Sequence, residues 1–138
     1  MRRIAVVGAS GFVGATLVEH LLTQAQQDEV LPFIHSSGNA WRLARLGIKL
    51  YPLNLLAQDQ VEAAVAGCTH VVNCSRGDPE VMIKGLASLL AASRKHNIQR
   101  FIHLSSVLVY GDPPPPGSVH ENAVTCPTKG TYGELKLQ

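Results

Sequence analysis

The stretch "IAVVGASGFVG" at residues 4–14 decides the expected fold. Residues 4–8 form an apolar run of strand length that passes directly into a glycine-rich turn. In such a turn, Gly8 permits the sharp exit from the strand and Gly14 lets the next helix pack closely on a sheet, while Gly11 leaves room for a ligand's phosphates. Because the free N–H groups at a helix start bind phosphate, the stretch predicts a dinucleotide-binding strand–turn–helix unit.

The rest of the chain alternates apolar runs of strand length with segments of helical periodicity. Predicted strands follow at residues 30–35, 48–53, 70–75 and from residue 100, and predicted helices cover residues 12–25, 39–46, 57–66 and 78–96. Pro32, inside the second strand, predicts a bulge or weaker pairing. Nearly apolar strands separated by helices indicate a parallel sheet covered on both faces. With right-handed crossovers this predicts a doubly wound α/β domain of about five strands. If the strand order is 3-2-1-4-5, the fifth strand is an edge of the sheet.

Composition restricts the class of protein. The chain has 138 residues, of which 46% are hydrophobic and 16% charged, so we expect one globular domain. A formal net charge of +2 argues against binding to nucleic acid or to an anionic membrane. No apolar run is long enough to span a bilayer, and glycines interrupt the N-terminal run that might otherwise serve as a secretion signal. We therefore expect a cytoplasmic protein.

The cysteines and histidines show no pattern of a metal site. The three cysteines, Cys68, Cys74 and Cys126, lack CxxC spacing, which argues against zinc or a disulfide framework and fits a reducing compartment. The histidines have no metal-ligand spacing either. His103, within the fifth predicted strand, is interpreted as a satisfied core or edge histidine. No metal is expected.

A proline-rich segment at residues 111–130 follows the predicted sheet. Its four consecutive prolines, residues 113–116, predict an extended polyproline II conformation in a rigid surface loop, with an SH3 or WW ligand as the less favoured alternative. Helical character resumes at about residue 130. There Tyr132 and Lys136 stand four residues apart, which places them on one helical face. A nearby ammonium group favours the phenolate form of a tyrosine.

Together these motifs resemble the extended or atypical short-chain dehydrogenases/reductases of the NAD-dependent epimerase/dehydratase group. The GxxGxxG spacing of the first turn, "SSVLVYG" at residues 105–111 and "YGELK" at residues 132–136 stand in that family's order. The resemblance covers essentially the whole chain and implies an NAD(P)-binding Rossmann domain over residues 1–138. It extends only to the N-terminal part of the proteins in that family. We therefore expect a domain truncated before the C-terminal substrate lobe.

The resemblance also implies a catalytic set. Ser106 matches the serine that hydrogen-bonds the reacting substrate oxygen, and Tyr132 matches the general acid/base. Lys136 matches the lysine that holds the nicotinamide ribose and favours the phenolate of the tyrosine. Tyr110 belongs to the "VYG" signature and is not the acid. These roles imply hydride transfer at a hydroxyl or carbonyl centre of a small-molecule substrate that the sequence does not identify.

The expected cofactor site combines the glycine turn with residues that follow later strands. Its expected members are Gly8, Ser10, Gly11, Phe12, Val13, Gly14, His35, Ser36, Ser37, Arg42, Asn54, Cys74, Ser75 and Lys136. The second strand ends at His35 without the acidic residue that would bond a ribose 2′-hydroxyl, and Arg42 and Arg45 follow. We therefore expect NADP to be preferred over NAD. The sequence does not decide whether Arg76 binds phosphate or partly obstructs the site.

Three functions follow from this reading. The first is an NAD(P)-dependent oxidoreductase or epimerase/dehydratase-like protein present as a fragment. The second is an NADP-binding module or redox sensor without chemistry. The third is a subunit completed by a partner chain or by a second copy in a homodimer. Whether these 138 residues are active is left open.

Overall fold

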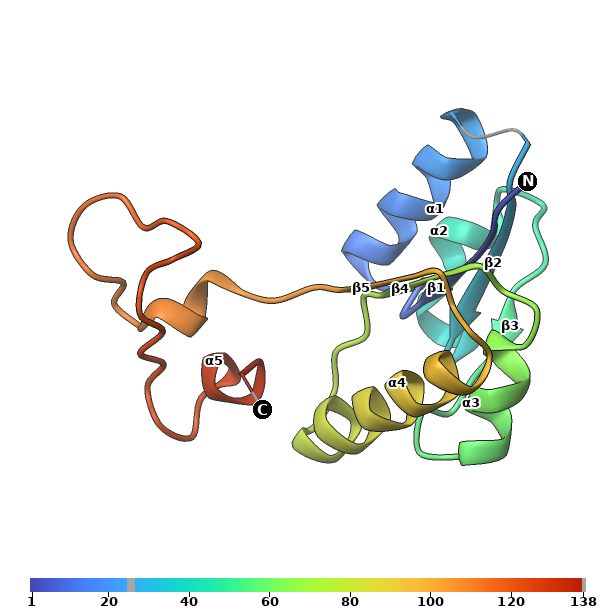
Figure 1. Cartoon of the computed structure of the whole chain (residues 1–138). Coiled ribbons are helices and arrows are strands. Elements are labelled where there is room, and N and C mark those ends of the chain that lie inside the picture. The colour runs from blue at the N-terminus through green and yellow to red at the C-terminus, as the bar shows by residue number, and fades with distance from the viewer. Residues whose placement is uncertain (25–26, 138) are drawn as a thin grey trace. The chain divides into compact units, whose positions relative to one another are not determined.

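The computed structural model describes residues 1–24 and 27–137, which divide into two compact units. Unit 1 is Met1–His103 and contains the sheet and the helices packed on it, and unit 2 is Leu104–Gln138 (Figure 1). Residue 25, the last of the first predicted helix, lies outside the described residues.

Unit 1 is built on a five-stranded parallel sheet in the order β3-β2-β1-β4-β5, which confirms the predicted topology. The strands are β1 (Arg3–Val7), β2 (Glu29–Ile34), β3 (Tyr51–Pro52), β4 (His70–Asn73) and β5 (Arg100–His103). Val7 lies opposite Phe33 of β2 and Asn73 of β4. The carboxyl ends of the three central strands therefore meet at one edge of the sheet, where doubly wound folds bind ligands.

Helices cover both faces of the sheet (Figure 1). They are α1 (Phe12–Gln24), the 3₁₀ turn η1 (Ser37–Asn39), α2 (Trp41–Ala44), α3 (Gln58–Val65), the π-helical turn η2 (Val81–Gly85) and α4 (Leu86–Lys95). Successive residues of β1 face opposite clusters, as strand geometry requires. Val6 packs in one cluster with Val18 of α1, and Val7 packs in the other with Val61 of α3 and Leu89 of α4.

Pro32 explains why β3 has only two residues. Successive backbone groups of a strand point alternately to its two neighbours. The carbonyl of Phe33 accepts from Ala9 N at 3.0 Å on the β1 side, and the carbonyl of Ile34 accepts from Leu53 N at 2.8 Å on the β3 side. Pro32 therefore faces β3 with no N–H to donate. The expected weaker pairing is confirmed, but the expected bulge is wrong, because the β1–β2 register runs unbroken through the proline.

Unit 2 contains two short helical segments, the 3₁₀ helix η3 (Val107–Tyr110) and α5 (Tyr132–Leu135). α5 is shorter than the helix predicted from residue 130. It packs directly on η3, because a Cβ atom added at Gly133 would lie 2.3 Å from the carbonyl oxygen of Leu108. The proline run is exposed, and the chain bends at residues 112–113 and 116–117, so the prediction of one uninterrupted extended run is wrong.

Candidate functional site

The glycine turn after β1 has the geometry that its sequence predicts. Gly8 has φ +76°, a conformation that disfavours side chains, and its backbone lies against another loop. A Cβ atom at Gly8 would lie 2.7 Å from both Cα and N of Ser75. The turn is closed by Gly11 N, which donates to Gly8 O at 3.1 Å.

Gly14 and Gly11 differ in what the fold requires of them. A Cβ atom at Gly14 would lie 2.3 Å from Gly8 O and 2.9 Å from Ala9 Cα, so only glycine lets α1 begin this close to the turn. A Cβ atom at Gly11 would meet only Gly8 O, at 3.3 Å. The fold itself therefore demands Gly8 and Gly14, whereas a side chain at Gly11 would require Gly8 O to shift by only a few tenths of an ångström. This weaker demand is consistent with a ligand as a further reason for that glycine.

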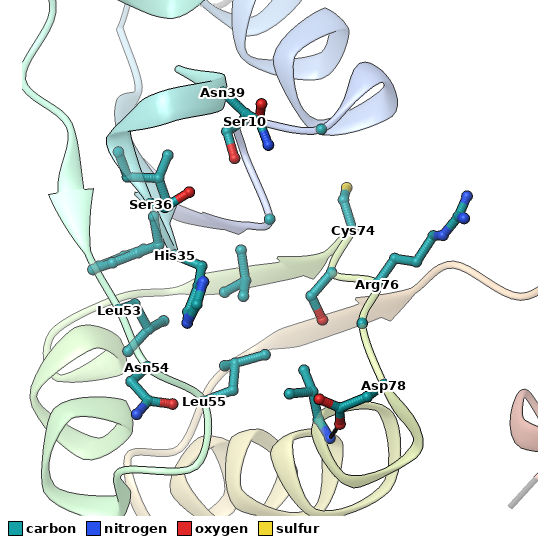
Figure 2. Close-up of a pocket in the computed structure, with 18 residues that line it drawn as sticks. Ser10, His35, Ser36, Asn39, Leu53, Asn54, Leu55, Cys74, Arg76 and Asp78 are labelled. Atoms are coloured by element: carbon teal, nitrogen blue, oxygen red, sulfur yellow. Dashed lines mark hydrogen bonds between the residues drawn. The ribbon is translucent and has the colours of Figure 1, made fainter.

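A cavity of about 440 Å³ opens at the carboxyl ends of the central strands, beside this turn (Figure 2). Its walls are Val7, Gly8, Ser10, Gly11, Phe33, Ile34, His35, Ser36, Asn39, Leu53, Asn54, Leu55, Cys74, Ser75, Arg76, Gly77, Asp78 and Val81. Eight of the residues expected to bind a cofactor lie in these walls, namely Gly8, Ser10, Gly11, His35, Ser36, Asn54, Cys74 and Ser75. The cavity has the size and the switch-point position of a ligand site in this architecture.

Other expected cofactor residues lie outside the cavity walls. Phe12 and Val13 form the first turn of α1, with 83% and 51% of their surfaces exposed. Gly14 packs beneath the turn, and Ser37 is exposed in η1. Lys136 belongs to unit 2 and is described below.

Arg42 is held by a carboxylate of α1. Its guanidinium makes a two-point ion pair with Glu19, in which Nε lies 2.9 Å from Oε1 and Nη2 donates to Oε2. Arg45 adds a contact to the same carboxylate at 3.3 Å. The hydrogen bond from Arg42 holds the pKa of Glu19 below its ordinary value. The cation expected to attract a 2′-phosphate is therefore already paired within the protein.

Several wall residues were not expected from the sequence. Asn39, Leu53, Leu55 and Val81 line the cavity without a local motif that marks them. Asp78 could have been predicted as the start of a helix, because an acidic residue directly before a proline is typical of that position. Its Oδ1 accepts from Val81 N at 3.0 Å, which caps the helix that borders the cavity. Asn54 was expected, and its Oδ1 accepts from Leu56 N at 3.0 Å, which fixes the amide at the wall.

The expected catalytic residues lie on two segments of unit 2 that contact each other. Ser106 caps η3, where its Oγ accepts from Leu108 N at 3.2 Å. Lys136 follows α5, and its Nζ donates to the carbonyl of Leu104 at 2.8 Å. The same Nζ lies 5.5 Å from the centroid of the Tyr132 ring, so Tyr132 and Lys136 share one face as their spacing predicts.

Residues 1–24 and 27–137 hold neither a metal-ligand cluster nor a membrane-spanning helix. These residues contain no group of three histidine, cysteine or acidic side chains placed to hold a metal ion. Within the same residues, none of the helices combines the length and the apolar character needed to cross a bilayer.

Known proteins share this fold and part of this sequence. A dTDP-glucose 4,6-dehydratase of Streptomyces niveus is 30% identical over an alignment of 134 residues, and the match covers 81% of this chain and 40% of that protein. The crystal structure of a UDP-glucose 4-epimerase of Thermus thermophilus in complex with NAD superposes with a TM-score of 0.81 and 26% identity, over 97% of this chain and 47% of that one. A dTDP-glucose 4,6-dehydratase of Bacillus anthracis in complex with NAD gives a TM-score of 0.88 at 19% identity, a likeness of fold alone, over 99% of this chain and 47% of that one.

The chain thus spans less than half the length of these relatives. A family model described as the NAD dependent epimerase/dehydratase family matches residues 4–138. That match includes the glycine turn, the cavity walls and the serine, tyrosine and lysine of unit 2. The chain therefore belongs to the NAD dependent epimerase/dehydratase family.

Proposed function

We propose that the chain binds a nicotinamide dinucleotide in the cavity of unit 1, with the pyrophosphate on the glycine turn. The observation that carries this proposal is Gly11, a cavity-wall residue where the fold demands glycine much less strictly than at Gly8 or Gly14. A pyrophosphate that approaches the backbone there meets the N-terminus of α1, whose free N–H groups and dipole favour negative charge. The bound NAD of related structures supports the same ligand class.

Exchange of Gly11 for alanine tests this binding mode. The substitution should disturb the fold much less than Gly14→Ala, because the new Cβ meets only one atom, at 3.3 Å, and requires that atom to shift by only a few tenths of an ångström. It also fills the space in which the pyrophosphate would lie, so affinity for NADH should fall about tenfold in isothermal titration calorimetry. Gly38→Ala is the matched control, since a Cβ at Gly38 has no atom within 4 Å and Gly38 is not a cavity wall residue. Equal NADH affinity of both variants and the wild type would contradict the proposal.

The preference for NADP over NAD stays a prediction, and the ion pair of Arg42 works against it. The absence of a carboxylate at the end of β2 favours a 2′-phosphate, and Ser36 and Asn39 offer polar groups in the wall. Arg42, however, is engaged by Glu19. Glu19→Gln removes that competing charge and should raise the affinity for NADPH relative to NADH. An unchanged ratio in calorimetric titrations means that Arg42 does not contact the phosphate.

We further propose that unit 2 carries the chemistry of a family enzyme. When bound, the dinucleotide supplies hydride transfer. Tyr132 exchanges a proton with the substrate oxygen, and the hydroxyl of Ser106 hydrogen-bonds that oxygen. Lys136 stabilises the phenolate of Tyr132 electrostatically from its position 5.5 Å from the ring centroid. Relatives named as dTDP-glucose and UDP-glucose enzymes suggest a sugar nucleotide as the substrate class.

Turnover of dTDP-glucose or UDP-glucose, followed by product analysis, tests this second step. Tyr132→Phe should abolish turnover, because it removes the phenol proton, and should leave NADH affinity within about twofold, because the ring is kept. Turnover that survives this substitution excludes the acid/base role. Dinucleotide binding without any turnover favours the alternative function, a nucleotide-binding module without chemistry.

Location and assembly belong to the same proposal. Cys68 and Cys126 are free thiols, which supports a reducing compartment such as the cytoplasm. Among the described residues β5 pairs only with β4, and Ile102 on it has 43% of its surface exposed. That edge supports completion of the sheet by a second copy or a partner. Light scattering that gives a monomer at high concentration would count against such an assembly.

A further inference from the structure

The buried amide of Asn73 has only one possible orientation. Asn73 ends β4 with 1% of its surface exposed. Its Oδ1 lies 3.0 Å from the backbone N of Ser75 and 2.6 Å from Ser75 Oγ. Because a backbone N–H can only donate, the atom that faces it must be the amide oxygen. The NH₂ group of Asn73 therefore points the other way, to β5.

This orientation determines the proton position on His103. The register of β4 and β5 places His103 opposite Asn73, and the ring Nδ1 lies 3.1 Å from Asn73 Nδ2. Since the amide NH₂ only donates, Nδ1 must accept, and the proton of the neutral ring is on Nε2. A ring with hydrogen on Nδ1 would bring two donors together and force the amide to turn away from Ser75.

Ser75 transmits this arrangement to the glycine turn. The backbone of Ser75 lies so close to Gly8 that a Cβ there would be 2.7 Å from Ser75 Cα. Both residues are walls of the cavity. Because the two backbones lie this close, the position of Ser75 limits the position of the turn on which the phosphates would rest. Each link of the chain from His103 through Asn73 and Ser75 to Gly8 is a direct contact.

We propose that His103, as the neutral Nε2–H tautomer, is a positioning residue for the dinucleotide site and acts through Asn73 and Ser75. It does not touch the ligand. The proposal rests on the proposed binding of a dinucleotide, and it assigns a role to a histidine that the sequence presents only as a satisfied strand residue.

Two substitutions of His103 separate hydrogen bonding from packing. His103→Leu removes the hydrogen-bond acceptor of the buried Asn73 NH₂ group, so the amide no longer holds Ser75 in place. The Kd for NADH should therefore rise about tenfold. His103→Asn keeps an acceptor, because an asparagine Oδ1 stands where Nδ1 stood, and should restore affinity to within about twofold of the wild type. His70→Leu is the matched control. It removes another half-buried sheet histidine, at the opposite end of β4, and should leave the Kd unchanged.

Nitrogen NMR of the intact chain gives a second readout that is independent of ligand. We expect the His103 ring to carry its proton on Nε2, and the Ser75 amide to exchange slowly in the wild type and in His103→Asn but faster in His103→Leu. A proton on Nδ1 would overturn the proposal, as would equal NADH affinity of the leucine and asparagine variants. If the wild type binds neither NADH nor NADPH, the proposed function fails, and the tautomer and exchange data still decide whether His103 positions Ser75.

Discussion

Gly14→Ala tests the packing of α1 on the glycine turn. The new Cβ would lie 2.3 Å from Gly8 O, whereas an ordinary contact of a Cβ atom is 3.4 Å or longer. The helix and the turn must therefore separate by about 1 Å. Both sides of the contact are backbone, so no side-chain rotation relieves it. Ala9 Cα, at 2.9 Å, blocks the neighbouring direction.

Two opposing effects set the size of the change. Overpacking costs about 1–3 kcal/mol, and a clash between backbone atoms belongs at the upper end of that range. Alanine is a better helix former than glycine by about 1 kcal/mol, which offsets part of the cost. The expected net loss in free energy of unfolding is about 2 kcal/mol. For a chain of 138 residues this corresponds to a Tm lower by about 7 °C.

Urea unfolding followed by circular dichroism measures this difference directly. Gly38→Ala is the control, because its Cβ enters open space and the stability should stay within about 0.5 kcal/mol of the wild type. A Gly14→Ala variant as stable as the wild type, or more stable, would show that helix propensity dominates. The close approach of α1 to the turn would then not be what requires glycine at that position.

Three further predictions concern other parts of the molecule. Gly133→Ala places a Cβ 2.3 Å from Leu108 O and should detach α5 from η3, seen as faster amide hydrogen exchange in α5 with unchanged protection of the sheet. Burial raises the pKa of the Cys68 thiol, so DTNB at pH 8 should modify exposed Cys126 first and Cys68 only on unfolding. Because the folded-state pKa is the higher one, the stability linked to the Cys68 thiol is complete below its unfolded value of about 8.5 and is lost as pH rises through the folded value. Urea titrations of Cys68→Ala should lack that alkaline loss. Asp78→Ala removes a helix cap and should cost about 1 kcal/mol in urea unfolding, whereas Asp78→Asn should keep most of the stability.

The sheet topology could be predicted because its signals are local. An apolar run, a glycine turn and a helical period can each be read in a window of about fifteen residues. β3 shows where this fails. Its predicted span, residues 48–53, is apolar enough for a strand, yet only Tyr51–Pro52 pairs. The reason lies on the neighbouring strand β2, where Pro32 has no N–H to donate. The sequence of residues 48–53 alone does not reveal which strand will pair with it.

The residues of the candidate site likewise fall into those that local sequence reveals and those whose roles depend on contacts between distant parts of the chain. Gly8, Gly11 and Gly14 could be recognised because the turn is contiguous in sequence. The pairing of Arg42 with Glu19 joins residues on α2 and α1 and depends on how the two helices pack. The roles of Asn73 and His103 depend on the strand register, which sets residues far apart in the sequence side by side.

The two prolines of β2 and β3 also bear on whether the protein stays dispersed in solution. Because Leu53 N donates to Ile34 O, Leu53 faces β2, and its neighbour Pro52 turns its backbone to the outer side of the sheet. An added strand there would find no donor at Pro52 and only a two-residue strand to pair with. Short edges that lack donors resist the recruitment of other chains into β-aggregates. Replacement of Pro32 and Pro52 would lengthen this edge and supply donors, which would make the β3 side of the sheet a site of aggregation.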